Sequence, residues 1–289
     1  MKTVFQNRKR REAGVALLFL APSFGGLVVF WFAPFVLTIY RSFTDALGKK
    51  NVGFSNYRSV LENSAFQLAA ANTLRFLAVC LPLLLCVSLV LALCVHALHP
   101  GGRRFKTTFL LPMALPVASM VVLWKALFSE NGLLNGRLTA LGLQPVDFMG
   151  TDAAFWVLVV TYLWKNSGYD MILWLAGLDG IPGSLYEAAQ VDGANSVQQF
   201  WYITLPQLRS TLGLTAVLSL LNMFKVFREA YLVAGSYPHE SMYLLQHLFN
   251  NWFLSMDLGR LCAAAVLLAL SLLLIVMPLQ FVLRGADEH

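Results

Sequence analysis

Six long apolar runs alternate with polar segments along the chain. An α-helix needs about 20 residues to cross the hydrocarbon core of a bilayer, and each run reaches that length. Helices also satisfy their own backbone hydrogen bonds in lipid. The pattern therefore predicts an all-α integral membrane protein with six transmembrane helices, at residues 15–39, 74–97, 107–128, 153–178, 210–233 and 261–283.

The spans divide the chain into three regions. A transmembrane domain covers residues 15–284, a basic segment precedes it at residues 1–14, and a charged tail follows at residues 285–289. An even number of spans places both termini on one side. Lys and Arg gather in residues 1–14 and in the turn at 103–106, and basic residues favour the cytoplasmic side. Both termini and the segment between the fourth and fifth spans are therefore predicted to be cytoplasmic.

Composition supports a membrane protein over a soluble one. The chain is 58% hydrophobic and 12% charged, with a mean hydropathy of +0.65, whereas a soluble domain is about one quarter charged. The net charge of +6 would also fit a nucleic-acid-binding protein. Because the basic residues cluster beside apolar runs, membrane topology explains them better. We therefore expect a lipid bilayer, and no nucleic acid, among the partners.

The sequence predicts no catalytic residues, no metal site and no cofactor in this chain. Its histidines have no ligand spacing with a carboxylate or cysteine, and a GxxxxGK[ST] phosphate-binding loop is absent. The cysteines lie inside apolar runs and form no CxxC pair, which indicates small packed side chains. They are Cys80, Cys86, Cys94 and Cys262.

Charged residues interrupt two of the spans. The fourth contains Lys165 and Asp170, and the fifth contains Lys225 and Glu229. A charge within a membrane helix costs about 2.5–3.5 kcal/mol on insertion scales, so it usually faces a cavity or a partner helix. Lys165 and Asp170 lie about 140° apart around a helix, which predicts different surroundings for the two. Lys225 and Glu229 have the i,i+4 spacing of an ion pair.

Polar and aromatic side chains also share a face of each of these two spans. Aromatic rings that stack on sugar rings, and amides that bond hydroxyl groups, suit a sugar pathway. Helix–helix packing through polar contacts explains the same pattern. The candidate pathway residues are Tyr162, Lys165, Asn166 and Tyr169 in the fourth span, and Ser219, Asn222, Met223 and Val226 in the fifth.

A polar segment, residues 184–208, joins the fourth span to the fifth. Ser184 followed by Glu187 predicts a capping box and a short helix that ends at Gly193, since glycine accepts the left-handed turn of a helix end. A second short amphipathic helix is expected to end at Pro206. Two roles remain open for Glu187, namely capping its own helix and facing a basic residue of a partner.

The same segment resembles the EAA loop of permease subunits of ATP-binding-cassette importers. The matching residues are Glu187, Ala188, Ala189, Asp192, Gly193, Ala194, Phe200, Ile203, Leu205 and Pro206. Looser signatures are similar to those of carbohydrate-importer permeases. These are Phe54 to Tyr57, Asn72 to Leu74, Leu111-Pro112, Trp124, Gly132 and Asn135.

The resemblance implies the type I importer permease fold and a division of labour among subunits. In the family, the loop docks into a cleft on an ATPase, which assigns ATPase coupling to Glu187, Ala188, Ala189, Asp192 and Gly193. ATP and Mg would be bound by two separate ATPase subunits. The other expected partners are an extracytoplasmic solute-binding protein and a second permease, in a heterodimer, with a homodimer as the less favoured alternative. The expected location is the cell (inner) membrane of a bacterium or archaeon.

The substrate implied by the resemblance is a sugar or oligosaccharide. Another polar solute, such as a glycerol-phosphate-type compound, is the alternative, because Lys165 would suit an anionic group if it faced the cavity. The sequence favours an importer over two other classes of membrane protein. An intramembrane enzyme would need a nucleophile with a base, or a set of metal ligands, and a channel has no use for the loop at residues 184–208.

Overall fold

The computed structural model describes residues 15, 17–98 and 102–284, and the chain divides into two compact units. The basic segment 1–14 and the tail 285–289 lie outside the described residues, as do the side chains of the basic turn at Arg103 and Arg104. The larger unit comprises residues 63–251 and 271–289, and the smaller comprises residues 1–62 and 252–270. Both are helical, and the described residues contain only one isolated β-bridge, between Thr44 and Asn51.

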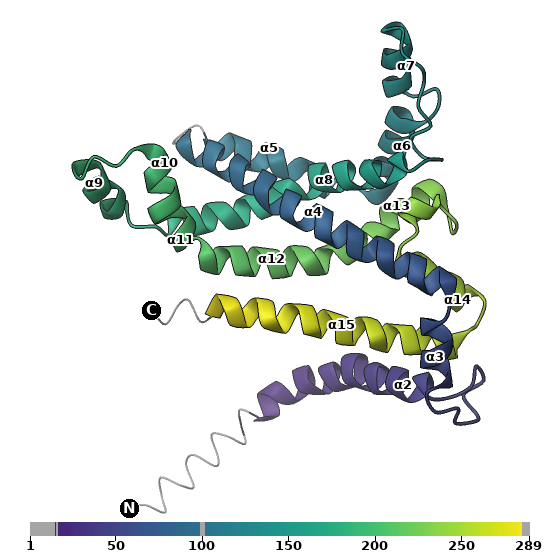
Figure 1. The fold of residues 1–289 in the computed structure, drawn as a ribbon. Coiled ribbons are helices and arrows are strands. Elements are labelled where there is room, and N and C mark those ends of the chain that lie inside the picture. Colours follow the sequence, from purple (N-terminus) through teal and green to yellow (C-terminus); the bar gives the residue numbers. More distant parts are fainter. Residues whose placement is uncertain (1–14, 16, 99–101, 285–289) are drawn as a thin grey trace, which may run out of the picture. The chain divides into compact units, whose positions relative to one another are not determined.

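The larger unit holds most of the helices (Figure 1). Its first half contains α4 (Ser64–Ala97), α5 (Gly102–Ala114), α6 (Val117–Phe128), α7 (Leu133–Ala140) and α8 (Ala153–Asp179). Its second half contains α9 (Gly183–Val191), α10 (Ser196–Gln199), the π-turn η3 (Phe200–Thr204), α11 (Leu205–Gln207), α12 (Arg209–Met223), the 3₁₀ turn η4 (Phe224–Val226), α13 (Phe227–Ala234) and the 3₁₀ turn η5 (Glu240–Met242). Helices α14 (Leu245–Leu254) and α15 (Leu258–Arg284) each have residues in both units.

The smaller unit begins with the first apolar segment. Residues Leu17–Ser42 are helical, with a π-turn η1 (Val28–Phe32) before α2 (Ala33–Ser42), and α3 (Ser55–Leu61) follows. The Asn56 amide donates hydrogen bonds to the carbonyl oxygens of Ser42 (2.9 Å) and Thr44 (2.8 Å). A Cβ on Gly259 would come within 3.0 Å of that amide. Asn56 therefore fixes the turn after α2, which accounts for its place in the Phe54–Tyr57 signature.

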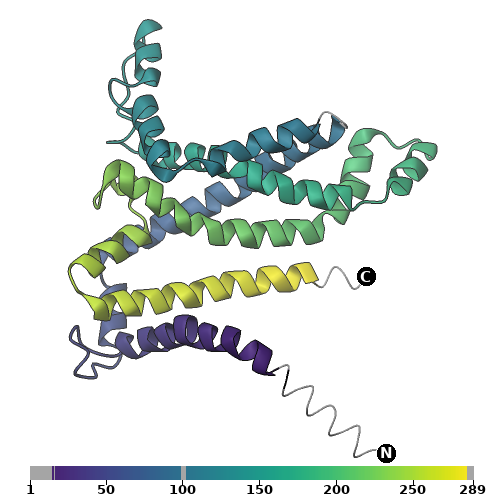
Figure 2. The ribbon, with the colours of Figure 1, turned by 180° about the vertical axis from the view of Figure 1, so that it is seen from behind.

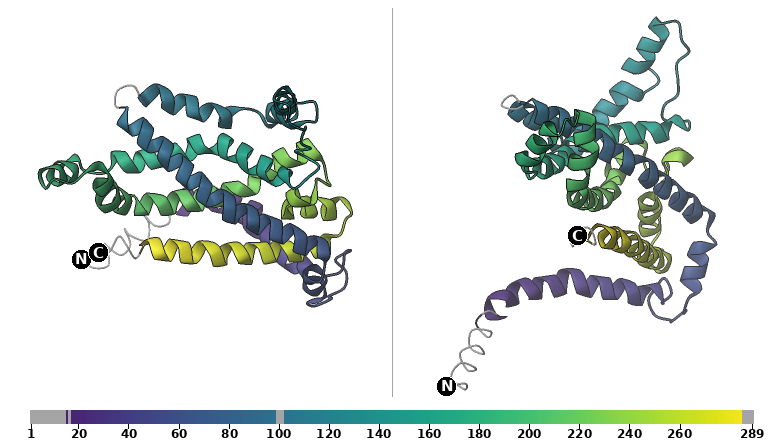
Figure 3. Two further views of the ribbon diagram at one scale, coloured as in Figure 1. Left: turned by 45° about the horizontal axis from the view of Figure 1, so that its top comes forward. Right: turned by 60° about the vertical axis from the view of Figure 1, so that its left-hand side comes forward.

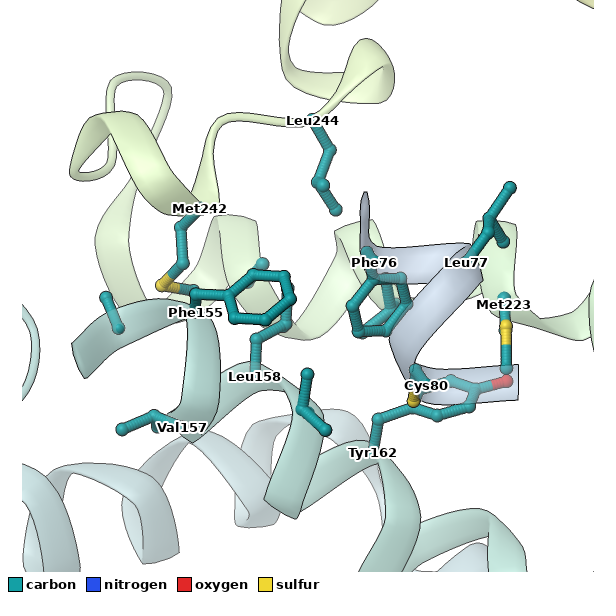
Figure 4. Close-up of a cluster of buried hydrophobic side chains, with 14 of the residues drawn as sticks. Phe76, Leu77, Cys80, Phe155, Val157, Leu158, Tyr162, Met223, Met242 and Leu244 are labelled. Carbon is teal, nitrogen blue, oxygen red and sulfur yellow. The ribbon is translucent and has the colours of Figure 1, made fainter. Parts of the chain in front are cut away.

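Helix α8 is the centre of the larger unit. It packs against α4, α5 and α12 (Figures 2 and 3). Figure 4 shows α4 side chains such as Phe76 and Cys80 beside Phe155 and Leu158 of α8 in one buried apolar cluster. A Cβ on Gly168 would overlap the carbonyl oxygen of Phe109 in α5. Glycine thus allows the backbones of α5 and α8 to touch, as small residues do in membrane helix packing.

Five helical segments of the described chain are long and apolar enough to cross a membrane: Leu17–Ser42, Ser64–Ala97, Val117–Ala140 (α6 and α7), Arg209–Ala234 (α12 to α13) and Leu258–Pro278. Helix α8 is not among them, although it covers the predicted fourth span. Lys165, Asn166 and Asp170 lower its hydropathy. The count of six spans therefore remains a prediction.

Two predicted spans differ in extent from the helices. Residues 107–128 do not form one helix, because α5 ends at Ala114 and α6 begins after Pro116. Proline lacks an N–H and forces the preceding residue out of the helical region. The second span begins at Ser64 instead of residue 74, since the Asn63 side chain caps α4 by accepting a hydrogen bond from the backbone N–H of Phe66 (3.0 Å).

The first turns of α4 hold the segment around η5. The Asn72 amide donates to the carbonyl oxygens of Glu240 (2.5 Å) and Tyr243 (3.0 Å). The Thr73 hydroxyl accepts a hydrogen bond from the backbone N–H of Leu245 (3.0 Å). These polar residues lowered the apolar signal of the sequence, yet they are buried and belong to the helix.

His247 lies in α14, outside the predicted spans, and its imidazole is fully buried against Phe227 and Tyr243. Burial lowers the pKa of His247 from 6.5 to about 4, because desolvation disfavours the charged ring. The unfolded chain binds a proton at a higher pH than the folded chain does. Stability should therefore fall as the pH drops from about 6.5 towards 4.

We expect the free energy of unfolding to decrease by about 2 kcal/mol between pH 7 and pH 5 through His247 alone. Thermal unfolding in detergent across this range measures the effect. The variant His247→Gln should lose that part of the pH dependence. An unchanged pH profile in the variant would contradict the assignment to His247.

Candidate functional site

A cavity of about 130 Å³ lies between α8 and the segment formed by α12, η4 and α13. Its lining comprises Met113, Tyr162, Lys165, Asn166, Asn222, Lys225, Val226 and Glu229. Five of the eight candidate pathway residues are therefore brought together: Tyr162, Lys165, Asn166, Asn222 and Val226.

The other three candidates do not line the cavity. Tyr169 is half-buried one turn further along α8. Ser219 is buried and donates a hydrogen bond to Oδ2 of Asp170 (2.6 Å), which joins α12 to α8. Met223 is buried in the apolar cluster. For Ser219 and Met223, helix packing explains the pattern.

An ion pair crosses the cavity. The Lys165 ammonium donates a hydrogen bond to Oε1 of Glu229 in α13. Only 15% of the Lys165 side chain and 10% of the Glu229 side chain are exposed. As expected, Lys165 and Asp170 have different surroundings, because Asp170 bonds Ser219 instead.

The predicted Lys225–Glu229 ion pair is wrong. Lys225 is exposed and donates a hydrogen bond to Oδ1 of Asn222 (2.7 Å). The 3₁₀ turn η4 (Phe224–Val226) separates α12 from α13 and breaks the α-helical spacing on which that prediction depended. The sequence therefore pointed to the right span but to the wrong partner for Glu229.

Two residues of the cavity lining each have one buried polar atom without a hydrogen-bond partner among the described residues. These atoms are the Tyr162 hydroxyl and Oε2 of Glu229. The Tyr162 ring is held edge-on by Phe76, with centroids 5.6 Å apart, and lies in the cluster drawn in Figure 4. The Asn166 amide donates back to the carbonyl oxygen of Tyr162 (2.9 Å).

The segment at residues 184–208 forms an elbow beyond the ends of α8 and α12 (Figures 1 and 3). Gly193 has φ +78°. Its N–H bonds the carbonyl oxygen of Gln190 (3.1 Å), and the Ala194 N–H bonds that of Ala189 (2.9 Å). This pair of bonds is the Schellman motif of a helix end. The predicted glycine stop is confirmed.

The predicted capping box is wrong. Helix α9 begins at Gly183 directly after Pro182 and has no side-chain cap, which puts Ser184 inside its first turn. The capping box of this segment belongs to α10, where Asn195 and Gln198 each accept a hydrogen bond (2.9 Å) from the other's backbone N–H. Glu187 therefore does not cap its own helix, and the role left open for it is contact with a partner.

Pro206 does not end the second helix. It lies in the first turn of α11, where a missing N–H costs little, and the π-turn η3 precedes it. The helical path is interrupted two residues later, at Leu208 with φ −79° and ψ 1°. The helical path from α10 through η3 and α11 to α12 is therefore broken at one residue, Leu208.

The elbow carries an exposed surface with both charge and apolar area. Glu187, Ala188, Asp192 and Gly193 are exposed and Ala189 is half-buried. Within the described part of the chain, Glu187 makes no ion pair. The exposed apolar residues are Leu185, Val191 (88% exposed), Val197, Trp201 and Tyr202.

A hydrogen bond fixes the elbow internally. The hydroxyl groups of Tyr186 in α9 and Thr204 in η3 lie 2.8 Å apart. Thr204 is buried. Sequence reasoning missed this contact, because the two residues are 18 positions apart and no local pattern links them.

Comparison with known proteins gives a family match over most of the chain. Residues 85–287 match the family described as the binding-protein-dependent transport system inner membrane component. The trehalose/maltose transport system permease protein MalF of Thermococcus litoralis is 31% identical over 90% of each chain. The xylose/arabinose import permease protein XacH of Haloferax volcanii is 34% identical over 76% of this chain and 75% of its own.

A solved structure has the same fold. A chain of a bacterial ABC transporter involved in the import of the acidic polysaccharide alginate superposes with a TM-score of 0.83, covering 98% of this chain and 99% of that one at 24% identity. Proteins of the matched family are permease subunits and not enzymes. The chain therefore belongs to the family of inner-membrane components of binding-protein-dependent transport systems, and it is a multi-pass membrane permease with the fold of the type I ABC importers.

Proposed function

We propose that this chain forms half of the pathway by which an ABC importer carries a sugar or oligosaccharide across the cell membrane. The observation that carries the proposal is the cavity between α8 and α13, with an aromatic ring, amides and the hydroxyl of Tyr162, which has no partner among the described residues. These groups match the apolar faces and hydroxyl groups of a sugar. Relatives named for trehalose/maltose and xylose/arabinose transport support the same solute class.

The size of the cavity supports a second permease subunit. Its volume of about 130 Å³ is well below the ~300–1,000 Å³ of ordinary ligand pockets. One chain thus supplies one wall, and a second permease, in a heterodimer, supplies the other. The membrane topology that goes with this proposal has six spans and both termini in the cytoplasm.

Coupling to ATP hydrolysis is assigned to the elbow. Glu187 and Asp192 offer exposed carboxylates to a basic partner surface, and the exposed Val191 and Val197 offer apolar contact. The elbow joins α8 to α12, and these two helices flank the cavity. A push on the elbow by an ATPase subunit, which binds ATP and Mg, would therefore move both walls and alternate the access of the cavity.

Solute delivery is assigned to an extracytoplasmic binding protein. A similar fold, with a TM-score of 0.80 and 24% identity, occurs in the bacterial alginate ABC transporter in complex with an alginate pentasaccharide-bound periplasmic protein. Residues 235–251, which follow α13 in the larger unit, lie at the opposite end of α12 from the elbow (Figure 1). This segment is where we expect such a protein to bind.

Reconstitution tests the function directly. The chain is assembled with its partner permease and ATPase subunits in proteoliposomes, and uptake of radiolabelled maltose, trehalose and xylose is followed with the binding protein outside. We expect uptake only when ATP is supplied on the side of the membrane where the ATPase subunits lie. ATP-independent uptake by the permease alone would favour a channel and contradict the proposal.

The glycerol-phosphate-type solute remains the second candidate. It depended on a free Lys165 ammonium in the cavity. Glu229 already compensates that charge, so the observation that favoured an anion is weaker than the sequence indicated.

The variant Tyr186→Phe is expected to weaken coupling. It removes the 2.8 Å contact with Thr204, and a hydrogen bond of this kind contributes about 1 kcal/mol net. We expect ATP-driven uptake to fall about fivefold, with the affinity for the binding protein unchanged. The ratio of solute transported to ATP hydrolysed measures the effect. Tyr202→Phe is the matched control, because it removes the hydroxyl group of an exposed tyrosine in η3 of the same elbow.

A further inference from the structure

Two residues that line the cavity each carry a buried polar atom without a hydrogen-bond partner among the described residues. The Tyr162 hydroxyl comes from α8, and Oε2 of Glu229 comes from α13. Both residues are more than nine-tenths buried and both line the same cavity. Buried polar atoms without partners are rare and costly. At these two residues of the lining, a polar group from outside the chain would gain a hydrogen bond that the described chain does not supply.

Lys165 holds the Glu229 carboxylate in position. Its ammonium bonds one carboxylate oxygen, Oε1, and leaves the other, Oε2, without a partner among the described residues. The pair also cancels the two charges, which makes a buried carboxylate tolerable between helices. Lys165 is thus a positioning residue for Glu229 and is not available to bind an anionic group of a solute.

The chemistry of the unpartnered atoms restricts the solute. A carboxylate oxygen accepts hydrogen bonds and needs a donor, which a hydroxyl group supplies and an ionised carboxylate or phosphate does not. A tyrosine hydroxyl both donates and accepts. Hydroxyl groups of a neutral sugar supply such donors, whereas an ionised carboxylate or phosphate placed at Oε2 would bring only a second acceptor and leave Oε2 without a donor.

Resting on the proposed function, we propose that Glu229 is the specificity-determining residue of this cavity, which accepts a hydroxyl group of a neutral polyhydroxylated solute and disfavours acidic ones. Lys225 is the remaining cation of the lining. It is exposed and bonded to Asn222, so it does not reverse the selectivity set by the buried carboxylate.

The test measures solute binding to the permease without the binding protein. The complete permease–ATPase complex is placed in nanodiscs, and apparent dissociation constants are obtained from the solute-dependent shift of thermal unfolding. The probes are neutral maltose, trehalose and xylose and the acidic sugars glucuronate and galacturonate. We expect the wild-type complex to bind at least one neutral probe and to bind the acidic probes at least about tenfold more weakly.

Three variants separate the possible roles of the pair. Glu229→Gln should weaken binding of the neutral probe about tenfold. Lys165→Met should also weaken binding of the neutral probe, because Glu229 loses the ammonium that holds it in position. If Lys165 instead bound anionic solutes, this variant would weaken binding of the acidic probes only. The charge swap Lys165→Glu with Glu229→Lys keeps an ion pair and should move the preference about tenfold towards glucuronate. Glu62→Gln, in the exposed Arg58–Glu62 pair, is the matched control for removing one carboxylate.

The outcomes distinguish this inference from the proposed function. Preferential binding of glucuronate or galacturonate by the wild type would overturn the role of Glu229 and leave the importer function standing. The role of Glu229 would also be overturned if Glu229→Gln and the charge swap formed intact complexes by size-exclusion chromatography and bound the neutral probe as the wild type does. Oε2 would then bond only water. Absence of ATP-driven uptake in proteoliposomes would instead count against the importer function.

Discussion

Replacing Gly193 with valine is expected to reduce ATP-driven transport by about tenfold or more. Gly193 has φ +78°, and a Cβ there would meet no atom within 4 Å. The cost is therefore backbone strain alone. It amounts to about 1–2 kcal/mol for an ordinary L-residue in the left-handed region and more for a β-branched one.

Strain at Gly193 acts on the elbow that we assign to ATPase coupling. The bonds from Gly193 to Gln190 and from Ala194 to Ala189 form only with that left-handed residue. A loss of 1.4 kcal/mol corresponds to about tenfold in the population of the formed elbow. ATP hydrolysis would then no longer be transmitted to α8 and α12.

The matched control is Gly193→Asn, since asparagine tolerates the left-handed region better than valine does. We expect the asparagine variant to keep most of the uptake and the valine variant to lose it. Both should keep the wild-type affinity for the solute-binding protein, which binds elsewhere in the proposed scheme. Normal uptake by Gly193→Val would remove the coupling role of the elbow.

The variant Gly168→Val is expected to destabilise the fold by more than about 3 kcal/mol. The first added carbon would overlap the carbonyl oxygen of Phe109. A backbone carbonyl in a helix cannot move without moving the helix, so α5 must separate from α8. Overpacking of well-packed sites costs about 1–3 kcal/mol and occasionally more, and a backbone clash lies at the upper end.

Gly136→Val provides the comparison for Gly168→Val. Gly136 is also a helical glycine, in α7, but a Cβ there meets nothing within 4 Å. Helix propensity changes little between glycine and valine, so Gly136→Val should leave the unfolding temperature nearly unchanged. Thermal unfolding in detergent and the yield of assembled complex measure both variants. Equal behaviour of the two would mean that α5 and α8 are not in contact in the membrane.

Local patterns predicted the helical class and several element ends. The ranges 153–178 and 210–233 are covered by α8 and by α12 to α13, because a long apolar run with few charges has few alternatives to a helix in lipid. Gly193 ends α9 as expected, since a left-handed turn is a property of one residue. The capping box at Ser184 failed because Pro182 already starts the helix.

Contacts between distant residues could not be predicted in this way. The Lys165–Glu229 pair joins residues 64 positions apart, and Tyr186 and Thr204 are 18 apart. Which side chains meet depends on how each helix is rotated about its axis. The 3₁₀ turn η4 changes that rotation for α13, and the pattern of apolar and polar residues carries no signal of it.

The sequence by itself determined the all-helical membrane class, the glycine elbow and the two helical regions that carry polar residues, because hydropathy and backbone preference are local properties. Only the tertiary structure decided which polar groups share a cavity. It pairs Glu229 with Lys165 instead of Lys225, and it places Ser219 and Met223 in packing contacts. Among the described residues, one polar atom of Tyr162 and one of Glu229 have no hydrogen-bond partner. The reason is that burial and pairing arise only when helices far apart in the chain are brought together.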